Sequence, residues 1–182
     1  MIAELKNKKE IIAWSLYDFA NQPFTTLIVT FIFSAFFTES LAENNEQGTY
    51  LWSLGISITA LIVAFASPIL GALADSGGYR KLILMFSSYL CIGATICLYF
   101  FEPDQYFNIL GCNIDVAILA LLTFIIANIG FEFGTVFCNS YLSDLSSKKN
   151  MGKISGYAWG LGFVGAEAPD ALKKAAKSKN PF

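Results

Sequence analysis

Four long apolar runs constrain this sequence more than any other feature. They extend over residues 11–38, 50–73, 82–101 and 116–142. A helix that crosses a bilayer needs roughly 20 mostly apolar residues, and each of these runs is long enough. The first run is too long for a cleavable signal peptide, and it contains Asp18. We therefore expect an all-α integral membrane fold with four full spans.

A partial fifth span is expected over residues 154–166, which read ISGYAWGLGFVGA and are too few to cross a bilayer. The polar tail over residues 167–182 is interpreted as a short solvated helix or a disordered end. The favoured hypothesis is instead a non-native tail left by a truncation, a frameshift or a cloning remnant. We thus expect a cytoplasmic tail (residues 1–10), transmembrane helices 1–5 (residues 11–166) and this polar tail.

The composition excludes several classes of function. Of the 182 residues, 55% are apolar and 14% are charged, whereas a soluble domain carries about 25% charged residues. The net charge of −2 argues against binding nucleic acid through a basic surface. The sequence has no His and its four Cys form no CxxC pair, so we predict no enzyme, no metal site and no cofactor.

The charge of the segments that connect the apolar runs alternates in sign. The basic segments carry Lys6, Lys8, Lys9, Arg80, Lys81, Lys148, Lys149 and Lys153. The acidic segments, without Lys or Arg, carry Glu39, Glu43, Glu46, Glu102, Asp104 and Asp115. Cationic loops stay on the cytoplasmic side of a membrane. We therefore expect a multi-pass protein with a cytoplasmic N-terminus.

Two acidic residues lie inside the apolar runs, where ionisable groups are costly and usually face a protein interior or a water-filled cavity. Asp18 shares one helical face with Asn21, Gln22 and Thr25 in the first run. The spacing places its carboxyl roughly 10–15 Å deep on the cytoplasmic side. The structural alternative is that Asp18 caps a helix break at Pro23, which should kink the first span.

The fourth run carries a second polar face, made of Asn128, Glu132, Thr135 and Asn139. Glu132 lies at a similar depth to Asp18, so the two faces could line one cavity. A carboxyl in such a cavity can couple proton movement to substrate movement, or it can hold a cationic or zwitterionic substrate. The structural alternative is that Glu132 only bonds a neighbouring helix.

Small residues recur in two of the apolar segments, and we interpret them as helix-packing features. In the second run they are Ser53, Gly55, Ser57, Ala60, Ala64, Ser67 and Gly71. In the fifth segment, Gly156 and Gly160 have the same spacing. Close helix packing would permit sliding between helices but is not specific to transporters.

The loop between the second and third runs, GALADSGGYRK at residues 71–81, is predicted to be a tight cytoplasmic turn. Gly77 and Gly78 allow positive φ angles, and Asp75 can cap the helix that follows. The string resembles the loop signature of the major facilitator superfamily. It matches at Gly71, Leu73, Ala74, Asp75, Gly78, Arg80 and Lys81, whereas Ser76 and Tyr79 replace the usual basic residues.

Three further segments resemble the branch of this superfamily related to the vacuolar amino-acid effluxers of fungal autophagy. WSLYDFANQPFTTLIVTFIF (residues 14–33), FCNSYLSDL (137–145) and GKISGYAWGLGFVG (152–165) are similar to its first, fourth and fifth helices. The resemblance implies the N-terminal part of a twelve-helix transporter that moves small solutes by alternating access, with amino acids as a candidate class. It also implies that helices one and four line the cavity and that Asp75 and Arg80 belong to a cytoplasmic gate.

The sequence thus favours a truncated secondary transporter in the plasma (inner) membrane of a bacterium, with the lipid bilayer and a small-molecule substrate as partners. Such a transporter needs two six-helix halves. We therefore expect a missing C-terminal half, or other membrane helices, to complete the fold. The alternative is a small membrane interaction subunit that does not transport and that assembles through the second and fourth spans.

Overall fold

The structure is a computed structural model that describes residues 8–103, 105–109, 112–146 and 150–179, without the side chains of 107–109, 112–113 and 168–179. The loop residues Lys6, Asp104, Lys148 and Lys149, and the last three residues of the tail, lie outside the described residues. The chain divides into two compact units. The terminal unit comprises Met1–Phe31 and Cys138–Phe182, and the central unit comprises Ile32–Phe137.

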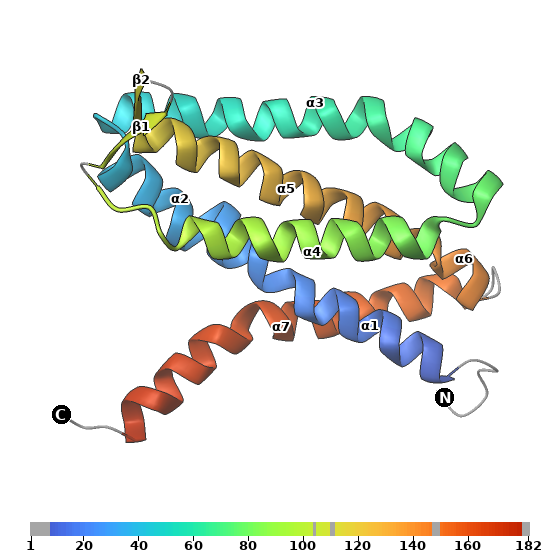
Figure 1. Cartoon of the computed structure of the whole chain (residues 1–182). Helices are drawn as coiled ribbons and strands as arrows, with labels where there is room; N and C mark the ends of the chain where they lie inside the picture. The colour runs from blue at the N-terminus through green and yellow to red at the C-terminus, as the bar shows by residue number, and fades with distance from the viewer. Residues whose placement is uncertain (1–7, 104, 110–111, 147–149, 180–182) are drawn as a thin grey trace. The chain divides into compact units, whose positions relative to one another are not determined.

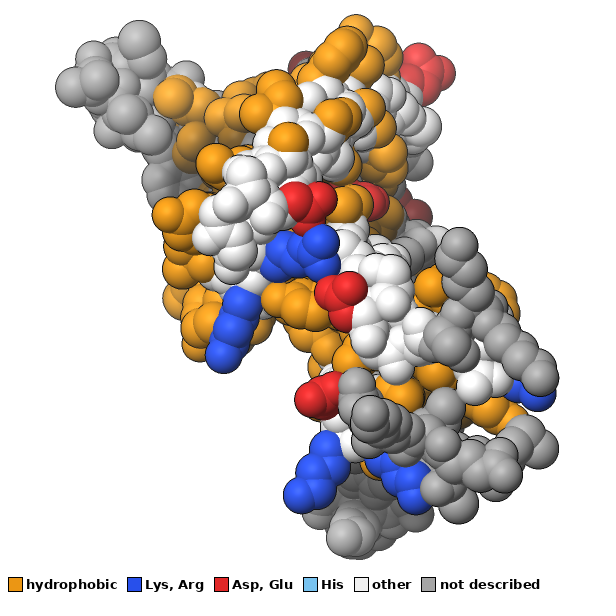
Figure 2. Space-filling view, turned by 90° about the vertical axis from the view of Figure 1, so that its right-hand side faces the viewer, with side chains coloured by type: hydrophobic (Ala, Val, Ile, Leu, Met, Phe, Trp, Pro, Cys, Tyr) orange, Lys and Arg blue, Asp and Glu red, His pale blue; other side chains and the backbone are white. Residues whose placement is uncertain are grey.

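Helices dominate both units (Figure 1), and the expectation of an all-α membrane fold is confirmed. Four helical stretches are long and apolar enough to cross a membrane: Lys8–Leu41, Asn45–Gly77, Arg80–Leu98 and Val116–Leu145. Large apolar side chains are exposed on them, and hydrophobic atoms cover broad areas of the face in Figure 2. In a soluble protein such a surface would be unfavourable, whereas in a bilayer it contacts lipid.

The first stretch is not a regular α-helix, and the reason lies at Pro23. Helix α1 (Lys8–Pro23) ends there and a π-helical segment, η2 (Phe24–Phe31), follows. Proline has no N–H to donate, so the Phe19 carbonyl four residues earlier loses its helical partner. Pro23 thus marks a change from α to π geometry, and the predicted kink stays a prediction. The stretch continues through α2 (Ile32–Phe36) and a second π segment, η3 (Phe37–Leu41).

The central unit is built around α3 (Asn45–Gly77), α4 (Arg80–Leu98) and α5 (Val116–Ser140). An antiparallel hairpin, β1 (Tyr106–Ile109) and β2 (Cys112–Asp115), lies in the connection between α4 and α5. The sequence did not predict this hairpin, because its strands are short and lack a clear apolar alternation. It ends at the start of α5, where Asp115 accepts a 2.9 Å hydrogen bond from the Ala117 N–H.

An aromatic cluster joins three elements of the central unit. The Trp52 ring of α3 stacks on Phe124 of α5 with 4.0 Å between ring centroids, and Phe37 of η3 lies 5.3 Å from Trp52. Phe37 and Phe124 are completely buried. Aromatic pairs in this geometry add packing energy beyond their buried area, so the cluster fixes these helices against one another.

Two glycines let helices of the central unit approach closely. A Cβ atom added to Gly130 of α5 would lie 2.8 Å from the Ser87 carbonyl oxygen and the Cys91 nitrogen of α4. A Cβ atom on Gly55 of α3 would lie 2.7 Å from a Leu121 methyl group. Helix packing through small residues is common in membranes. Of the predicted small residues of the second run, Gly55 is buried in this way, whereas Ser53, Ser57, Ala60 and Ala64 are exposed.

The terminal unit contains α1, the four-residue helix α6 (Leu142–Leu145) and α7 (Met151–Lys179). Helices α1 and α7 cross each other and begin at the same end of the unit (Figure 1). Helix α7 continues without interruption past Ala166 to Lys179. Residues 167–179 therefore continue α7. That the tail is non-native stays a prediction.

Candidate functional site

One face of α1 carries Trp14, Asp18 and Gln22 at intervals of four residues, so their side chains lie above one another. Trp14 is buried, and its indole Nε1–H donates a 2.8 Å hydrogen bond to the Cys138 carbonyl oxygen. This bond attaches α1 to the last turn of α5. Asp18, one turn further along, is half-buried. Asp18 is thus held inside the terminal unit.

Helix α7 approaches this face of α1 through two glycines. A Cβ atom added to Gly162 would lie 2.9 Å from Oδ2 of Asp18 and 3.0 Å from Cγ of Gln22. A Cβ atom added to Gly165 would collide with the carbonyl oxygen of Phe19. This carbonyl is the one that Pro23 deprives of its helical donor. The absence of side chains at both glycines therefore allows α7 to lie directly against the acid and the Phe19 carbonyl.

The glycines predicted to pack in this segment, Gly156 and Gly160, are not the ones that contact α1. Gly156 and Gly160 face open space, with no atom within 4 Å of an added Cβ, and both are exposed. The spacing did not identify the side of α7 that contacts α1, because each residue turns an α-helix by about 100° and Gly160 and Gly162 therefore point to nearly opposite sides. The spacing of two small residues does not reveal which side of a helix meets its neighbour.

The polar face of α5 is on the side of the helix that turns away from α4. Gly130 contacts α4, and Glu132 lies two residues, or about 200°, further round the helix. Asn128 is buried, Glu132 and Thr135 are half-buried, and Asn139 in the last turn is exposed. Glu132 belongs to the central unit and Asp18 to the terminal unit. That the two carboxyls line one cavity therefore stays a prediction.

Asn21 completes the predicted polar set of α1 and is half-buried. None of the described residues form a group of three or more His, Cys, Asp or Glu side chains that could hold a metal ion. The two polar faces together carry two carboxyls, four amides and hydroxyl groups, which can exchange protons and bind amino, hydroxyl or carboxylate groups of a solute.

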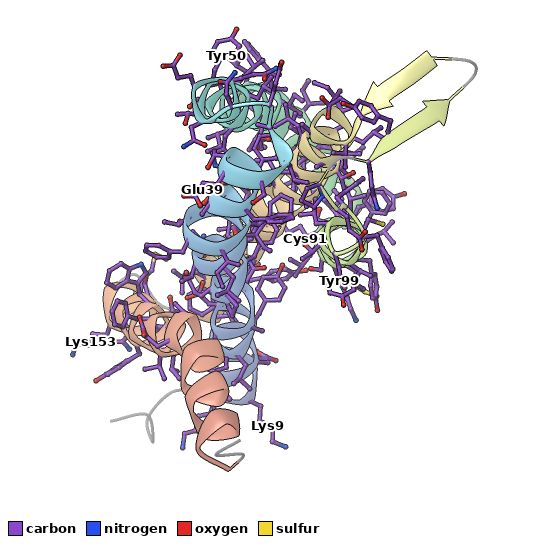
Figure 3. All side chains as sticks on the ribbon, turned by 90° about the vertical axis from the view of Figure 1, so that its left-hand side faces the viewer. Lys9, Glu39, Tyr50, Cys91, Tyr99 and Lys153 are labelled. Atoms are coloured by element: carbon purple, nitrogen blue, oxygen red, sulfur yellow. The ribbon has the colours of Figure 1, made fainter. Side chains whose placement is uncertain are left out.

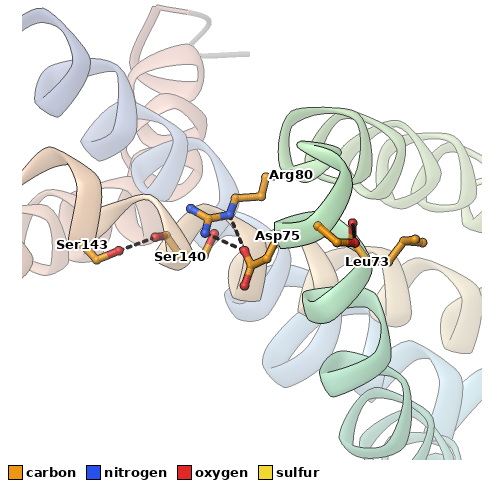
Figure 4. Close-up of polar contacts among 6 residues, drawn as sticks. Leu73, Asp75, Arg80, Ser140 and Ser143 are labelled. Atoms are coloured by element: carbon orange, nitrogen blue, oxygen red, sulfur yellow. Dashed lines mark hydrogen bonds and ion pairs between the residues drawn. The ribbon is translucent and has the colours of Figure 1, made fainter.

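The loop motif forms a compact turn closed by an ion pair (Figure 4). Arg80 donates from Nε and Nη2 to Oδ1 of Asp75, at 2.8 and 2.6 Å. Gly78 has a φ of 67°, and its N–H donates to the Ala74 carbonyl oxygen at the end of α3. A left-handed residue at this position ends a helix, and glycine adopts it without steric cost. Gly71 is half-buried, and Lys81 is exposed.

Two details of this turn differ from the prediction. Gly77 does not adopt a positive φ; it is the last residue of α3, and the Tyr79 ring lies against it. Asp75 does not cap α4. Its carboxylate pairs with Arg80, and the N-cap position of α4 is Tyr79, which makes no side-chain cap bond. A single left-handed residue is sufficient to end α3, so the second glycine remains helical.

These features define a multi-pass membrane protein with acidic residues inside its spans and an ion-paired turn between its second and third spans. The chain belongs to the vacuole effluxer Atg22-like family, whose model matches residues 49–158. It is 29% identical over 164 residues to the uncharacterized MFS-type transporter YxiO of Bacillus subtilis strain 168, with 88% of this chain and 36% of the relative covered.

A second relative is an uncharacterized protein of Aquifex aeolicus strain VF5, which is 31% identical over 162 residues, with 87% of this chain and 37% of the relative covered. The chain thus spans little more than a third of the length of the curated relatives it matches. No solved structure matches the chain.

Several residues of the site were not identified from the sequence. Trp14 carries a signal that could have identified it, because it lies one helical turn before Asp18 and its indole N–H needs an acceptor when buried in a membrane. Gly162 and Gly165 lie among other glycines of α7, and nothing in their local sequence distinguishes them. For Phe19, the sequence predicts only that its carbonyl cannot accept an α-helical hydrogen bond from Pro23. The contact with Gly165 is not predictable from the sequence.

Proposed function

We propose that this chain forms part of a secondary transporter of the major facilitator type, which moves a small solute across the membrane by alternating access. The observation that carries the proposal is a pair of half-buried carboxyls, Asp18 and Glu132, inside membrane-spanning helices of a chain in this family. Acidic residues are expensive at such depths and commonly mark ion or substrate pathways.

The proposed cavity is lined by the polar faces of α1 and α5. Its residues are Asp18, Asn21 and Gln22 from α1, and Asn128, Glu132, Thr135 and Asn139 from α5. A carboxyl there either takes up and releases the coupled proton or pairs with the cationic group of the solute. The amides and the hydroxyl group would then hold its remaining polar groups. Amino acids carry a cationic and an anionic group, and they are the proposed substrate class.

The turn between α3 and α4 is proposed to act as a cytoplasmic gate. Its residues are Gly71, Asp75, Gly78, Arg80 and Lys81. A surface ion pair such as Asp75–Arg80 contributes little to stability, so it can be exchanged for other partners at low cost when helices move. The left-handed Gly78 fixes the direction in which Arg80 enters α4.

The N-terminus is proposed to face the cytoplasm and the protein to reside in the plasma membrane of a bacterium. Lys9 and Lys153 support this orientation, because they lie near the starts of α1 and α7 and extend outward from these helices (Figure 3). Both helices begin at the same end of the terminal unit. In contrast, Glu39 lies at the opposite end of the first span. Such a charge asymmetry matches the positive-inside rule.

The proposal includes a further set of membrane helices as a partner, because two six-helix halves enclose the substrate site in transporters of this type. The part of YxiO that this chain does not match is a natural candidate for such helices in an experiment. The bilayer itself is the other partner, in contact with the exposed apolar side chains.

Transport is tested in proteoliposomes that contain the protein alone or co-expressed with the unmatched part of YxiO. Radiolabelled amino acids are followed under an imposed proton or sodium gradient. We expect accumulation that an ionophore abolishes, and loss of this accumulation in Glu132→Gln. Glu39→Gln is the matched control, since Glu39 is exposed in η3. Uptake equal to that of empty liposomes in both preparations, with insertion verified, would contradict the proposal.

A second candidate function is a membrane interaction subunit without transport. The observation in its favour is the exposed face of α3 formed by Ser53, Ser57, Ala60 and Ala64, where another helix could approach closely. Sedimentation of the purified chain in detergent tests it. A defined oligomer that Ala60→Leu dissociates supports this function, whereas a polydisperse aggregate argues against it.

A further inference from the structure

The contact between α1 and α7 has a chemical character that helix packing does not require. Gly162 lies against the carboxyl of Asp18 and the stem of Gln22, and Gly165 lies against the backbone carbonyl of Phe19. Gly55 meets the apolar side chains of Leu121 and Ile125, and Gly130 meets the backbone of α4; neither has a carboxyl among its nearest neighbours. The glycines of α7 instead face polar groups of α1 that a membrane interior disfavours.

The Phe19 backbone and ring are the groups of α1 that lie nearest to Gly165. Pro23 removes the N–H that would satisfy this carbonyl within α1. In a membrane, a carbonyl that has lost its α-helical donor is stabilised by other donors nearby. The Cα–H groups of a glycine are weak donors that recur at close helix contacts. Gly165 can supply them, because no side chain separates its backbone from the Phe19 oxygen.

Gly162 has a different role, since its neighbour is a side chain that can move. The space that a Cβ atom would fill at Gly162 is partly taken by Oδ2 of Asp18. The backbone of α7 therefore covers one side of the carboxyl. Trp14 meanwhile anchors α1 one turn earlier, through its hydrogen bond to Cys138. The Asp18 carboxyl thus lies between the turn of α1 that Trp14 anchors and the part of α7 that has no side chain at Gly162.

We propose that Gly162 and Gly165 are positioning residues for Asp18, with Gly165 setting the separation of α1 and α7 and Gly162 leaving the space in which the carboxyl is covered. Movement of α7 away from α1 then uncovers Asp18 and controls its access to solvent and solute. This inference rests on the proposed function for the importance of Asp18, but the geometry it describes can be tested without transport.

The test uses dicyclohexylcarbodiimide, an apolar reagent that forms a stable adduct with protonated carboxyls inside membranes. The full chain is labelled in detergent micelles or lipid nanodiscs, and adducts on Asp18 and Glu132 are quantified by mass spectrometry of peptides. Glu132 is the internal standard, because it belongs to the central unit. A general loosening of the fold would raise both adducts, whereas uncovering of Asp18 raises only one.

The variants are Gly162→Ala, Gly165→Ala and the matched control Gly160→Ala, which adds the same methyl group to the same helix in open space. We expect the Asp18/Glu132 ratio to rise about fivefold in Gly165→Ala, because the methyl group forces α7 off the Phe19 backbone. A rise of about twofold is expected in Gly162→Ala, since the side chain of Asp18 can turn aside. Gly160→Ala should leave the ratio unchanged.

An unchanged ratio in both Gly162→Ala and Gly165→Ala, or an equal rise in Gly160→Ala, would overturn the inference. If Gly165→Ala does not yield a folded chain, Gly162→Ala with its control decides the outcome. A failure of the proposed function looks different: transport is then absent from the wild-type protein or persists in Asp18→Asn, while the labelling ratios still report on the crossing.

Discussion

The central bundle of α3, α4 and α5 and the crossing of α1 with α7 both use glycine to bring helices together, but they bring different groups into contact. In the bundle, Gly55 meets a leucine side chain and Gly130 meets a regular α4 backbone. At the crossing, Gly162 and Gly165 meet a carboxyl and a carbonyl whose helical partner Pro23 removes. The first arrangement suits a fixed scaffold, and the second places polar groups where a transporter can use them.

The difference also appears in what surrounds each contact. The bundle contains the stacked rings of Trp52 and Phe124 at one level and the cluster of Ala74, Phe133 and Phe137 at another. The crossing also has buried apolar side chains, Ile11 of α1 and Ile154 and Ala158 of α7, and in addition the Trp14 indole is held by a hydrogen bond. We therefore expect substitutions in the bundle to act mainly on stability and those at the crossing to act mainly on Asp18.

The largest effect is expected from Phe124→Ala in the bundle. It removes a completely buried ring that stacks on Trp52 and leaves a cavity, which costs about 3 kcal/mol of unfolding free energy. The measurement is a denaturation curve in mixed SDS micelles, followed by tryptophan fluorescence. Leu122→Ala, exposed on the same helix, is the control, with an expected change within about 0.5 kcal/mol. Equal losses of unfolding free energy in Phe124→Ala and Leu122→Ala would contradict the role of the aromatic cluster in fixing the bundle.

Gly130→Ala should destabilise the bundle by about 1–3 kcal/mol, because its methyl group would press against the backbone of α4. Gly93→Ala provides a control of opposite sign: Gly93 lies in α4 with open space around it, so alanine should stabilise the helix by up to about 1 kcal/mol. The same denaturation curves measure both changes. If Gly130→Ala left the free energy of unfolding unchanged, the inferred close contact between α4 and α5 would be contradicted.

Trp14→Phe should cost about 1 kcal/mol, since it keeps an aromatic ring and removes the hydrogen bond to Cys138. Its effect should be confined to the terminal unit. Amide hydrogen exchange, resolved by peptide, is the appropriate measurement. Faster exchange is expected in α1 and the last turn of α5, while the peptides of α3 should keep their wild-type rates. Uniformly faster exchange would show that the two units do not respond separately.

The smallest effect on stability is expected at the loop ion pair. Asp75 is 64% and Arg80 32% exposed at the side chain, so the pair contributes less than about 1 kcal/mol. A double-mutant cycle with Asp75→Asn and Arg80→Gln measures it, and the coupling should weaken at high salt. A coupling energy of several kcal/mol that is insensitive to salt would indicate a structural, rather than a gating, role.

The features that were predictable from the sequence are those with a local cause. The four spans follow from the length of their apolar runs, and the lost helical hydrogen bond at Pro23 follows from a missing N–H. The loop motif was correctly placed between two helices, but the roles of Gly77 and Asp75 within it were not. A Gly-Gly pair does not show which glycine is left-handed, and an aspartate between two helices can pair with Arg80 as readily as it can cap.

The features that were not predictable depend on how helices are rotated against their neighbours. The sequence does not distinguish four glycines of α7: Gly156, Gly160, Gly162 and Gly165. Of these four, only Gly162 and Gly165 contact α1. The aromatic cluster has the same origin, since Phe37, Trp52 and Phe124 are distant in sequence and meet only through packing. Side-chain partners in a membrane bundle are thus a tertiary property, whereas the existence of the helices is a local one.

The most direct test of the account is transport by Asp18→Asn, measured in two ways in the same proteoliposomes. One assay follows accumulation of labelled amino acids driven by an ion gradient, and the other follows exchange of labelled for unlabelled solute without a gradient. If Asp18 carries the coupled proton or binds the solute, accumulation is lost, and exchange persists only in the first case. Accumulation at the wild-type rate in correctly inserted Asp18→Asn protein would contradict the account.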